Sequence, residues 1–132
     1  KISDNEVQFV SGKDDYDEGI RFIQEQFNTK LICLTLGKDG SRAYYKDLRV
    51  EVPGFKQENI VDTTGAGDTF CGCVLDFICS NGLEDLDEEK LRNMLTFANA
   101  AASLVTTKRG AIKSMPERTE IQRLMEGSNY HD

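Results

Sequence analysis

Apolar residues recur at helical spacing in three stretches of the C-terminal half. Residues 67–82 are apolar on almost every side, which predicts a buried helix that ends at Gly82. Residues 87–110 place apolar side chains three or four apart, between an acidic start and a basic end, which predicts an amphipathic helix. The apolar stripe of this helix comprises Leu91, Leu95, Ala98, Ala102 and Val105. Residues 117–127, after Pro116, predict a short final helix.

The first half of the chain alternates helical and strand patterns. The predicted helices are residues 3–10, which open on a capping-box pattern of Ser3 and Glu6, and residues 14–27, with Ile20, Ile23 and Phe27 on the apolar face. The predicted strands are residues 31–36, 41–47, 49–54 and 58–62, with a turn at 37–40 and a hairpin connection around Asp47 and Leu48. Residues 1–3 resemble the end of a further strand. This alternation predicts α/β layers in one domain.

Composition narrows the class of protein. The chain has 132 residues, of which 39% are hydrophobic and 30% charged, as in folded globular domains. No apolar run reaches the roughly 18–20 residues of a membrane span, and no secretory signal is visible at the start. The formal charge of −7 and the lack of a basic stripe disfavour nucleic acid and anionic membranes as partners. The four cysteines lie in apolar stretches without zinc-site spacing, which predicts a reduced, cytoplasmic protein.

A glycine-rich turn stands where a helix is about to begin. Residues 61–70 read VDTTGAGDTF, and the helical pattern follows directly. Backbone N–H groups at a helix N-terminus attract anions, and glycine lets the backbone approach them closely, so phosphate is the expected ligand. The segment lacks the lysine of a Walker A loop, and Phe70 replaces the third glycine of the Rossmann fingerprint. Neither of these phosphate loops is therefore present.

Asp68 follows the glycines inside the first turn of this predicted helix. A carboxylate there stabilises a helix N-terminus, so a purely structural role is one reading. It would also repel a bound phosphate, and that conflict is resolved if Asp68 faces a hydroxyl group that loses its proton while attacking phosphorus. The single histidine, His131, lies in the polar C-terminal tail, which leaves carboxylates for any proton transfer.

The segment VDTTGAGDTFCG resembles the D-T-x-G-A-G-D signature of the ribokinase-like (PfkB) carbohydrate kinases. LICLTLGKDGS, FANAAASLVTTKRGAIKSMP and KISDNE are similar to further segments of that family, in the same order. The combination resembles most the bacterial fructokinase branch. The resemblance implies a C-terminal fragment of a ribokinase-like three-layer α/β/α fold. Residues 1–132 would form the nucleotide- and phosphate-binding part of one kinase domain, without the N-terminal sugar-binding half and lid.

The resemblance also implies a role for each matching residue. Asp68 would be the catalytic base, and the N–H groups of Gly65, Ala66 and Gly67 would form an anion hole for the phosphoryl group. The residues beside the phosphates and ribose of ATP would be Thr35, Gly37 and Gly40. The residues beside the adenine would be Ala98, Asn99 and Ser103. Glu6 would help to organise Mg²⁺. Asp62, Thr64 and Ser114, with backbone carbonyls of residues 106–111, would form a K⁺ site.

Several of these residues also have structural readings. The family's asparagine in N-x-x-E is Ser3 here, and Ser3 with Glu6 forms a capping box whether or not a metal binds. Gly37 and Gly40 suit an ordinary hairpin turn, Asp62 suits a turn cap, and Asn99 suits a polar position on a helix surface. Both readings stay open for each of them.

The function implied by the resemblance is that of an ATP-dependent sugar kinase, fructokinase-like, which takes ATP and a sugar such as fructose as substrates. The complete protein would be a cytoplasmic enzyme, as a homodimer, and the fragment alone would be inactive and would self-associate. Alternatives are a ribokinase, nucleoside kinase or sugar-phosphate kinase of the same family, a non-catalytic nucleotide-binding module, or a plain structural α/β domain.

Overall fold

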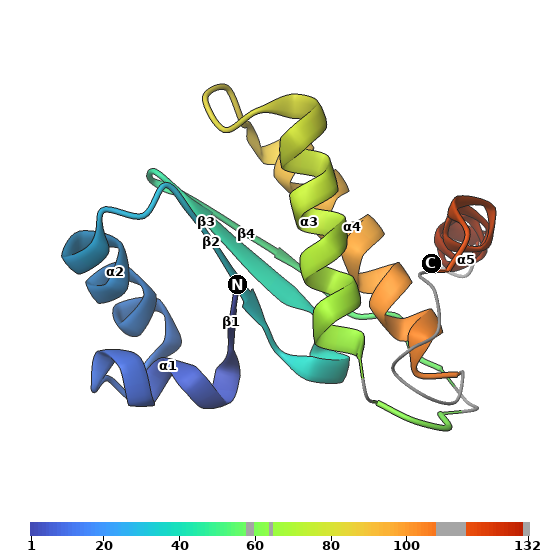
Figure 1. Ribbon diagram of the computed structural model, residues 1–132, viewed down its shortest axis with the longest axis horizontal. Coiled ribbons are helices and arrows are strands. Elements are labelled where there is room, and N and C mark those ends of the chain that lie inside the picture. Colours follow the sequence, from blue (N-terminus) through green and yellow to red (C-terminus); the bar gives the residue numbers. More distant parts are fainter. Residues whose placement is uncertain (58–59, 64, 108–115, 131–132) are drawn as a thin grey trace.

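The computed structural model describes residues 1–57, 60–63, 65–107 and 116–130 (Figure 1). Helices and strands alternate in the first half, and three helices follow in the second. In chain order the elements are β1 (Ile2–Ser3), α1 (Asp4–Ser11), α2 (Tyr16–Phe27), β2 (Leu31–Thr35), the 3₁₀ turn η1 (Gly37–Asp39), β3 (Ser41–Tyr45), β4 (Leu48–Val52), α3 (Ala66–Asn81), α4 (Glu88–Val105) and α5 (Arg118–Tyr130). The α/β organisation predicted from the sequence is confirmed.

The four strands form one sheet in the order β1-β2-β3-β4. β1 runs parallel to β2, with Ile2 opposite Leu34, so the strand end predicted at residues 1–3 is present. β2, β3 and β4 are antiparallel neighbours. The hairpin between β3 and β4 turns at residues 46–47, one residue earlier than predicted, and Leu48 already belongs to β4.

The strand predicted at residues 58–62 is not supported where the structure describes it. Residues 60–63 have no strand pairing, and residues 58 and 59 lie outside the described part. Instead, the N–H groups of Val61 and Asp62 both donate to the carbonyl oxygen of Thr106, at 2.8 and 3.0 Å. The segment before α3 is therefore anchored to the end of α4 and not to the sheet.

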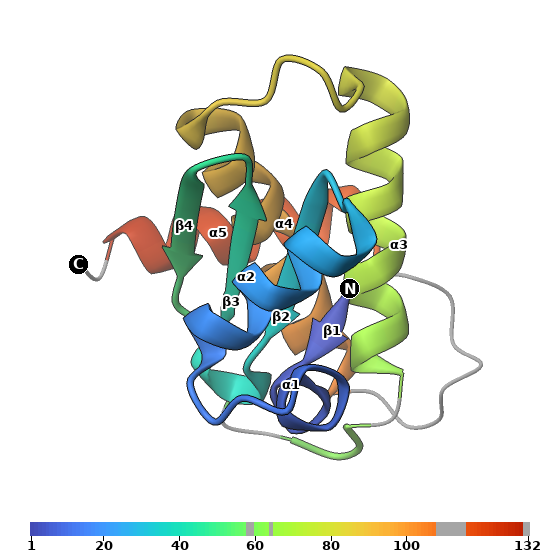
Figure 2. The same cartoon turned by 90° about the vertical axis from the view of Figure 1, so that its left-hand side faces the viewer.

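Each face of the sheet has its own apolar core, because side chains alternate along a strand. Ile32 and Leu34 of β2 pack with α1 and α2, whereas Cys33 faces α3 and α4. β2 is thus covered on both sides, which explains its continuous apolar sequence. Figure 2 shows α1 and α2 in front of the sheet and α4 behind it, and Figure 1 shows α3 and α4 on the side of the sheet away from α1 and α2. The arrangement is three-layered, α/β/α.

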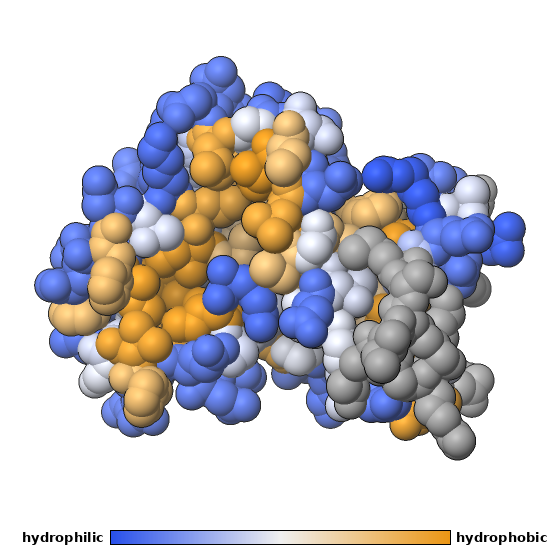
Figure 3. Space-filling model, in the orientation of Figure 1, coloured by the Kyte–Doolittle hydropathy of each residue, from blue (hydrophilic) through white to orange (hydrophobic). Residues whose placement is uncertain are grey.

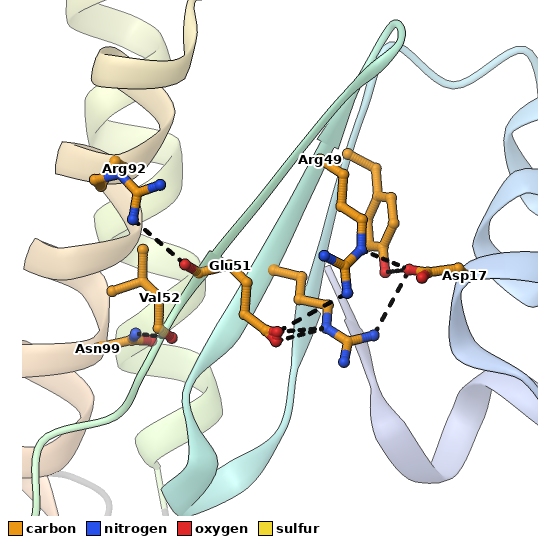
Figure 4. A network of polar contacts seen from close by, with 8 residues as sticks. Asp17, Arg49, Glu51, Val52, Arg92 and Asn99 are labelled. Carbon is orange, nitrogen blue, oxygen red and sulfur yellow. Dashed lines mark hydrogen bonds and ion pairs between the residues drawn. The ribbon is translucent and has the colours of Figure 1, made fainter.

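A polar network joins α2 to the neighbouring strands β3 and β4 (Figure 4). Asp17 of α2 accepts hydrogen bonds from the Tyr44 hydroxyl at 2.5 Å and from Arg49 Nε at 2.8 Å. Arg42 completes the network through Glu51, at 3.3 Å. Partial burial raises the pKa of Asp17, but the bonds from Tyr44 and Arg49 outweigh it, so the pKa lies below its ordinary value. These contacts hold α2 in register with β3 and β4.

The helices are less buried than their sequences suggest. α3 buries Phe70, Cys73 and Val74 against α4, but Leu75 is 60% exposed, so the prediction of a buried helix holds for one side of α3 and is wrong for the other. Phe27 is 66% exposed, and Ala102 is only half-buried. Within the described residues, no helix combines the length and apolarity needed to cross a membrane.

One face of the molecule carries a broad apolar surface. Figure 3 shows apolar side chains gathered between the α1–α2 layer and α3. Phe9 of α1 and Leu75 of α3 are 91% and 60% exposed. Among the described residues, β1 also has no strand on its outer edge. An open strand edge beside exposed apolar area favours association.

We predict that residues 1–132, produced alone, self-associate through this surface. Sedimentation velocity should show species larger than a monomer, and Leu75→Lys should shift the distribution towards the monomer. Phe27→Lys is the matched control, because Phe27 is as exposed as Leu75 but lies at the C-terminal end of α2, on the other side of the sheet from α3. A monodisperse monomer for the unaltered chain would contradict the prediction.

Candidate active site

The glycine-rich turn leads into α3 through a left-handed residue. Gly65 is the N-cap of α3, with φ 86° and ψ −5°, a conformation that glycine adopts without the steric cost of a side chain. The first intrahelical bond runs from Thr69 N–H to the Gly65 carbonyl at 2.9 Å. Ala66 N–H contacts the Thr63 carbonyl at 3.4 Å, which is long for a hydrogen bond. Helix geometry gives the N–H groups of Gly67 and Asp68 no acceptor within α3, so this end can bind an anion.

Asp68 lies in the first turn of α3 and is exposed to solvent. Its carboxylate is therefore not turned into the core, and its position is compatible with both the helix-stabilising and the catalytic reading. A hydroxyl group brought to the end of α3 could reach it. The role of Asp68 as a catalytic base therefore stays a prediction.

Lys1 stands next to the same turn, a position to which the sequence analysis gave no role. A methyl group placed on Gly67 would lie 3.3 Å from Lys1 Nζ. Lys1 is the first residue of the segment KISDNE. Its closeness to α3 could not be read from that segment, because it depends on the pairing of β1 with β2.

Glu6 caps its own helix, as the capping-box pattern predicted. The Ser3 hydroxyl donates to Glu6 Oε1 at 2.6 Å, and Ser3 N–H donates to the same atom at 3.0 Å. These two bonds, assisted by the charge of Lys1, lower the pKa of Glu6. The carboxylate is exposed and charged. Capping is thus confirmed, and Mg²⁺ binding stays a prediction.

The predicted nucleotide turn is held by close backbone packing. Thr35 ends β2, and Gly37 follows with φ 60° and open space around it. Gly40 is buried with φ 111°, and a Cβ atom there would lie 2.1 Å from the Val52 carbonyl oxygen. A Cβ atom on Gly54 would likewise lie 2.3 Å from the Lys38 carbonyl oxygen. The turn is pressed against residues 52–54, so packing alone requires glycine at position 40, whereas position 37 is free to face a ligand.

Asn99 is buried and paired inside the protein, contrary to its reading as a polar residue on a helix surface. Its Oδ1 accepts a hydrogen bond from the Ser41 hydroxyl at 2.8 Å. Its Nδ2 donates to the carbonyl oxygen of Val52 at 3.2 Å (Figure 4) and to that of Pro53 at 3.2 Å. Asn99 therefore ties α4 to the start of β3 and the end of β4. Both polar atoms of the Asn99 side chain are already hydrogen-bonded within the protein, so the geometry does not favour a side-chain contact with adenine. That contact stays a prediction.

The other two predicted adenine neighbours differ from each other. Ala98 is fully buried in the core, where its side chain offers no surface to a ligand. Ser103 is half-buried. Its hydroxyl donates to the Ala100 carbonyl at 2.9 Å and accepts from Gln57 Nε2 at 3.2 Å. Of the two, only Ser103 has a side chain that a nucleotide could approach.

The predicted K⁺ site is described in part. The backbone bonds from residues 61 and 62 to the Thr106 carbonyl bring Asp62 to the end of α4. The loop that contains Ser114, and Thr64 itself, lie outside the described residues. Among those described, no cluster of three or more histidine, cysteine, aspartate or glutamate residues could hold a metal ion. A divalent cation here would need further ligands from its substrate or from water.

The site segments gather at one end of the molecule. Figures 1 and 2 both place the end of β2 with η1, the start of α3 and the end of α4 at the lower end of the drawing. Ligands of α/β folds bind characteristically at the carboxyl ends of strands and the amino ends of helices. The structure therefore brings the predicted phosphate and nucleotide segments together at one end.

Comparisons with known proteins identify what this arrangement is similar to. A model of the pfkB family carbohydrate kinases matches residues 1–118. Probable fructokinase-4 from Arabidopsis thaliana is 41% identical over 128 residues, which are 97% of this chain and 39% of that protein. The resemblance to fructokinases thus extends beyond bacterial ones. This chain spans about two fifths of the length of that relative.

Solved structures share the fold. The fructokinase from Vibrio cholerae O395 with fructose, ADP and calcium ion bound superposes with a TM-score of 0.78 and 28% identity, over 93% of this chain and 39% of that one. A putative ribokinase II from E. coli in complex with ATP and Mg²⁺ superposes with a TM-score of 0.81 and 25% identity, over 96% of this chain and 38% of that one. The ribokinase-like fold predicted from the motifs is confirmed.

We expect Gly40→Ala to destabilise the complete protein far more than Gly37→Ala. The added methyl group at position 40 meets the Val52 carbonyl in a conformation that is nearly reserved for glycine, which should cost more than about 3 kcal/mol. At position 37 only the left-handed φ opposes alanine, at about 1–2 kcal/mol. Urea unfolding of both variants measures the difference. Equal costs would contradict the packing argument.

Asn99→Ala should lower stability by about 2–3 kcal/mol, because it leaves the buried Ser41 hydroxyl and two backbone carbonyls without their partner. Asn81→Ala is the matched control. Asn81 is exposed and makes one hydrogen bond to the Phe77 carbonyl, so its loss should cost less than about 1 kcal/mol. Thermal unfolding of the complete protein distinguishes the two. A neutral Asn99→Ala variant would show that this tie is dispensable.

Proposed function

The chain belongs to the pfkB family of carbohydrate kinases, and from this premise we propose that the complete protein is an ATP-dependent sugar kinase with fructose as its acceptor. The observation that carries the proposal is the start of α3, where a left-handed Gly65, open amide groups and an exposed Asp68 share one turn. The 41% identity with a plant fructokinase supports fructose as the acceptor.

The chemistry follows from that turn. Asp68 takes the proton of a sugar hydroxyl, whose oxygen attacks the γ-phosphorus of ATP. The bond between the γ-phosphorus and the β,γ-bridging oxygen breaks, and ADP leaves with that oxygen and its electron pair. The N–H groups of Gly65, Ala66 and Gly67 face the phosphoryl oxygens and stabilise their charge. One P–O bond forms to the sugar oxygen and one P–O bond to ADP breaks, and the proton ends on Asp68.

The nucleotide and its cations have candidate positions at the same end of the molecule as the start of α3. Thr35, Gly37 and Gly40 border the phosphates and ribose, and Ser103 lies on the adenine side. Mg²⁺, when bound, neutralises phosphate charge and is commonly held by one or two carboxylates together with phosphate oxygens. The exposed, charged Glu6 fits that requirement. Asp62 and Thr64, with Ser114 and carbonyls near Thr106, would hold K⁺.

The rest of the protein is expected to supply what this chain lacks. We place the nucleotide- and phosphate-binding half of the kinase domain in residues 1–132, and most sugar contacts and a lid outside it. The chain alone should therefore be inactive, and the complete enzyme is proposed to be a cytoplasmic homodimer. A ribokinase, nucleoside kinase or sugar-phosphate kinase is the alternative, because ribokinase II superposes as well as fructokinase does.

We predict that Asp68→Asn in the complete protein lowers kcat by roughly 10²–10⁴, because it removes the general base. The affinity for ATP should change little, since the amide keeps the shape of the side chain. Asp76→Asn is the matched control, because Asp76 is an exposed aspartate further along α3 that pairs only loosely with Arg118, at 3.6 Å. It should leave turnover unchanged.

A coupled assay of ADP formation with fructose and Mg·ATP measures both variants. Full turnover of Asp68→Asn would refute the assignment of the base. Absence of ATP binding or consumption by the unaltered protein would refute the kinase itself. A panel of ribose, nucleosides and sugar phosphates in the same assay tests the acceptor.

A further inference from the structure

The segment that joins β4 to α3 leads into the glycine-rich turn, so its position decides where the start of α3 stands. Its described residues, 53–57 and 60–63, belong to no helix or strand. A backbone of this kind lacks the hydrogen-bond ladder that holds a strand in place, and its polar groups must find partners on other elements. Hydrogen bonds to α4 supply partners at three places.

Both ends of the segment are tied to α4. At its start, Asn99 Nδ2 donates to the carbonyl oxygen of Pro53 at 3.2 Å. At its end, the carbonyl oxygen of Thr106, the C-cap of α4, accepts the N–H groups of Val61 and Asp62 at 2.8 and 3.0 Å. Figure 1 shows the segment passing the lower end of α4 before it enters α3. One tie therefore lies beside the nucleotide turn, and the other lies beside the glycine-rich turn.

The middle tie is made by two side chains. Gln57 Nε2 donates to the Ser103 hydroxyl at 3.2 Å, and this hydroxyl donates to the Ala100 carbonyl oxygen at 2.9 Å. Both side chains are half-buried. Because the proton of Ser103 is engaged by its own helix, the hydroxyl meets Gln57 as an acceptor. Positions 99, 103 and 106 are four and three residues apart, so the three ties follow one face of α4.

α4 acts as a spacer between the two turns of the site. A helix rises about 1.5 Å per residue, so the outer ties are about 10 Å apart along α4. The first tie adjoins the nucleotide turn, because a Cβ atom on Gly40 would lie 2.8 Å from the carbonyl carbon of Pro53. The last tie directly precedes the glycine-rich turn. The separation of the two turns is therefore set by α4, and the middle tie holds the connecting backbone against the helix.

We propose that the hydroxyl of Ser103 is a positioning group for phosphoryl transfer, which holds Gln57 and thereby aligns the amide groups of the glycine-rich turn with a nucleotide bound at residues 37–40. This inference rests on the proposed kinase function. Neither side chain bonds to the reacting atoms or moves a proton. The body of the Ser103 side chain can still border the adenine, since the positioning role belongs to the hydroxyl alone. Reaction rates are sensitive to such alignment, and a displacement of about 1 Å can cost about 10²-fold.

The test compares Ser103→Thr with Ser103→Val in the complete protein. Both variants have the same shape and the same branching at Cβ, but only threonine keeps a hydroxyl, which can donate to a carbonyl one turn back as serine does here. A coupled assay should show kcat about tenfold lower for Ser103→Val than for Ser103→Thr, less than the cost of a full displacement because the outer ties remain. The KM for ATP should be the same in both.

Thr96→Val is the matched control. The Thr96 hydroxyl also belongs to α4 and donates to a carbonyl one turn back, that of Arg92 at 2.7 Å, but it holds no part of the connecting segment. Its removal should leave kcat unchanged. An equal loss of kcat in Thr96→Val would overturn the proposal, because any missing hydroxyl on α4 would then have the same effect.

Binding and unfolding measurements separate positioning from the other roles that Ser103 could have. The affinity for ADP and the melting temperature should agree between Ser103→Thr and Ser103→Val, because the half-buried Gln57 amide can turn to water. Weaker ADP binding by Ser103→Val would mean that the hydroxyl contacts the nucleotide, and would overturn the proposal. A lower melting temperature with unchanged kcat would show a purely structural tie and overturn it as well.

Gln57→Leu provides an independent check, because it removes the other half of the tie. Its kcat should fall about as far as that of Ser103→Val, and the double variant should be no slower than either single one. Additive losses would overturn the proposal, since the two side chains would then act separately. Should Ser103→Val match Ser103→Thr while Asp68→Asn is inactive, only the positioning role fails. Should the unaltered protein consume no ATP, the kinase function fails first.

Discussion

The pairing of two residues of β1 with the end of β2 is the contact on which the rest of this structure depends. Parallel neighbours require a crossover connection, and α1 with α2 supplies it. Such crossovers are right-handed in nearly all proteins, which determines the face of the sheet that α1 and α2 cover. α3 and α4 must then cover the other face. The ends of β1 and β2 and the start of α3 consequently lie together, although they are more than 30 residues apart in sequence.

The glycines of the site illustrate how one residue type serves different physical needs. Gly65 adopts a left-handed conformation at the N-cap of α3. Gly67 leaves space beside Lys1, and Gly40 allows two backbone segments to approach more closely than any side chain would permit. Of the two glycines in the turn after β2, only Gly37, which is exposed and has open space around it, retains the freedom expected of a ligand loop. In the turn at residues 37–40, a glycine is therefore not by itself a sign of a phosphate contact, because close backbone packing alone accounts for Gly40.

The sequence predicted those features that depend on neighbours along the chain. The continuous apolar run of β2, the capping box at Ser3 and Glu6, and the helix that begins after the GAG turn all rest on local patterns. The exposure of Leu75 was missed because an apolar pattern does not reveal whether a neighbour covers it. The pairing of Asn99 was missed because its partners, Ser41 and Val52, are 58 and 47 residues away. Lys1 was missed for the same reason.

Charge at the site is organised locally and against the overall charge of −7. The amino end of α3 and Lys1 attract an anionic phosphate, whereas Asp68 in the same turn opposes it. Glu6 opposes it less, because its Oε1 is directed to Ser3 by two hydrogen bonds. A hydroxyl group between Asp68 and the phosphoryl group would relieve the remaining repulsion by sharing its proton with the carboxylate. In the proposed kinase, the acceptor and the phosphoryl group would therefore stabilise each other's binding, and transfer to the sugar would be favoured over loss of phosphate when no sugar is bound.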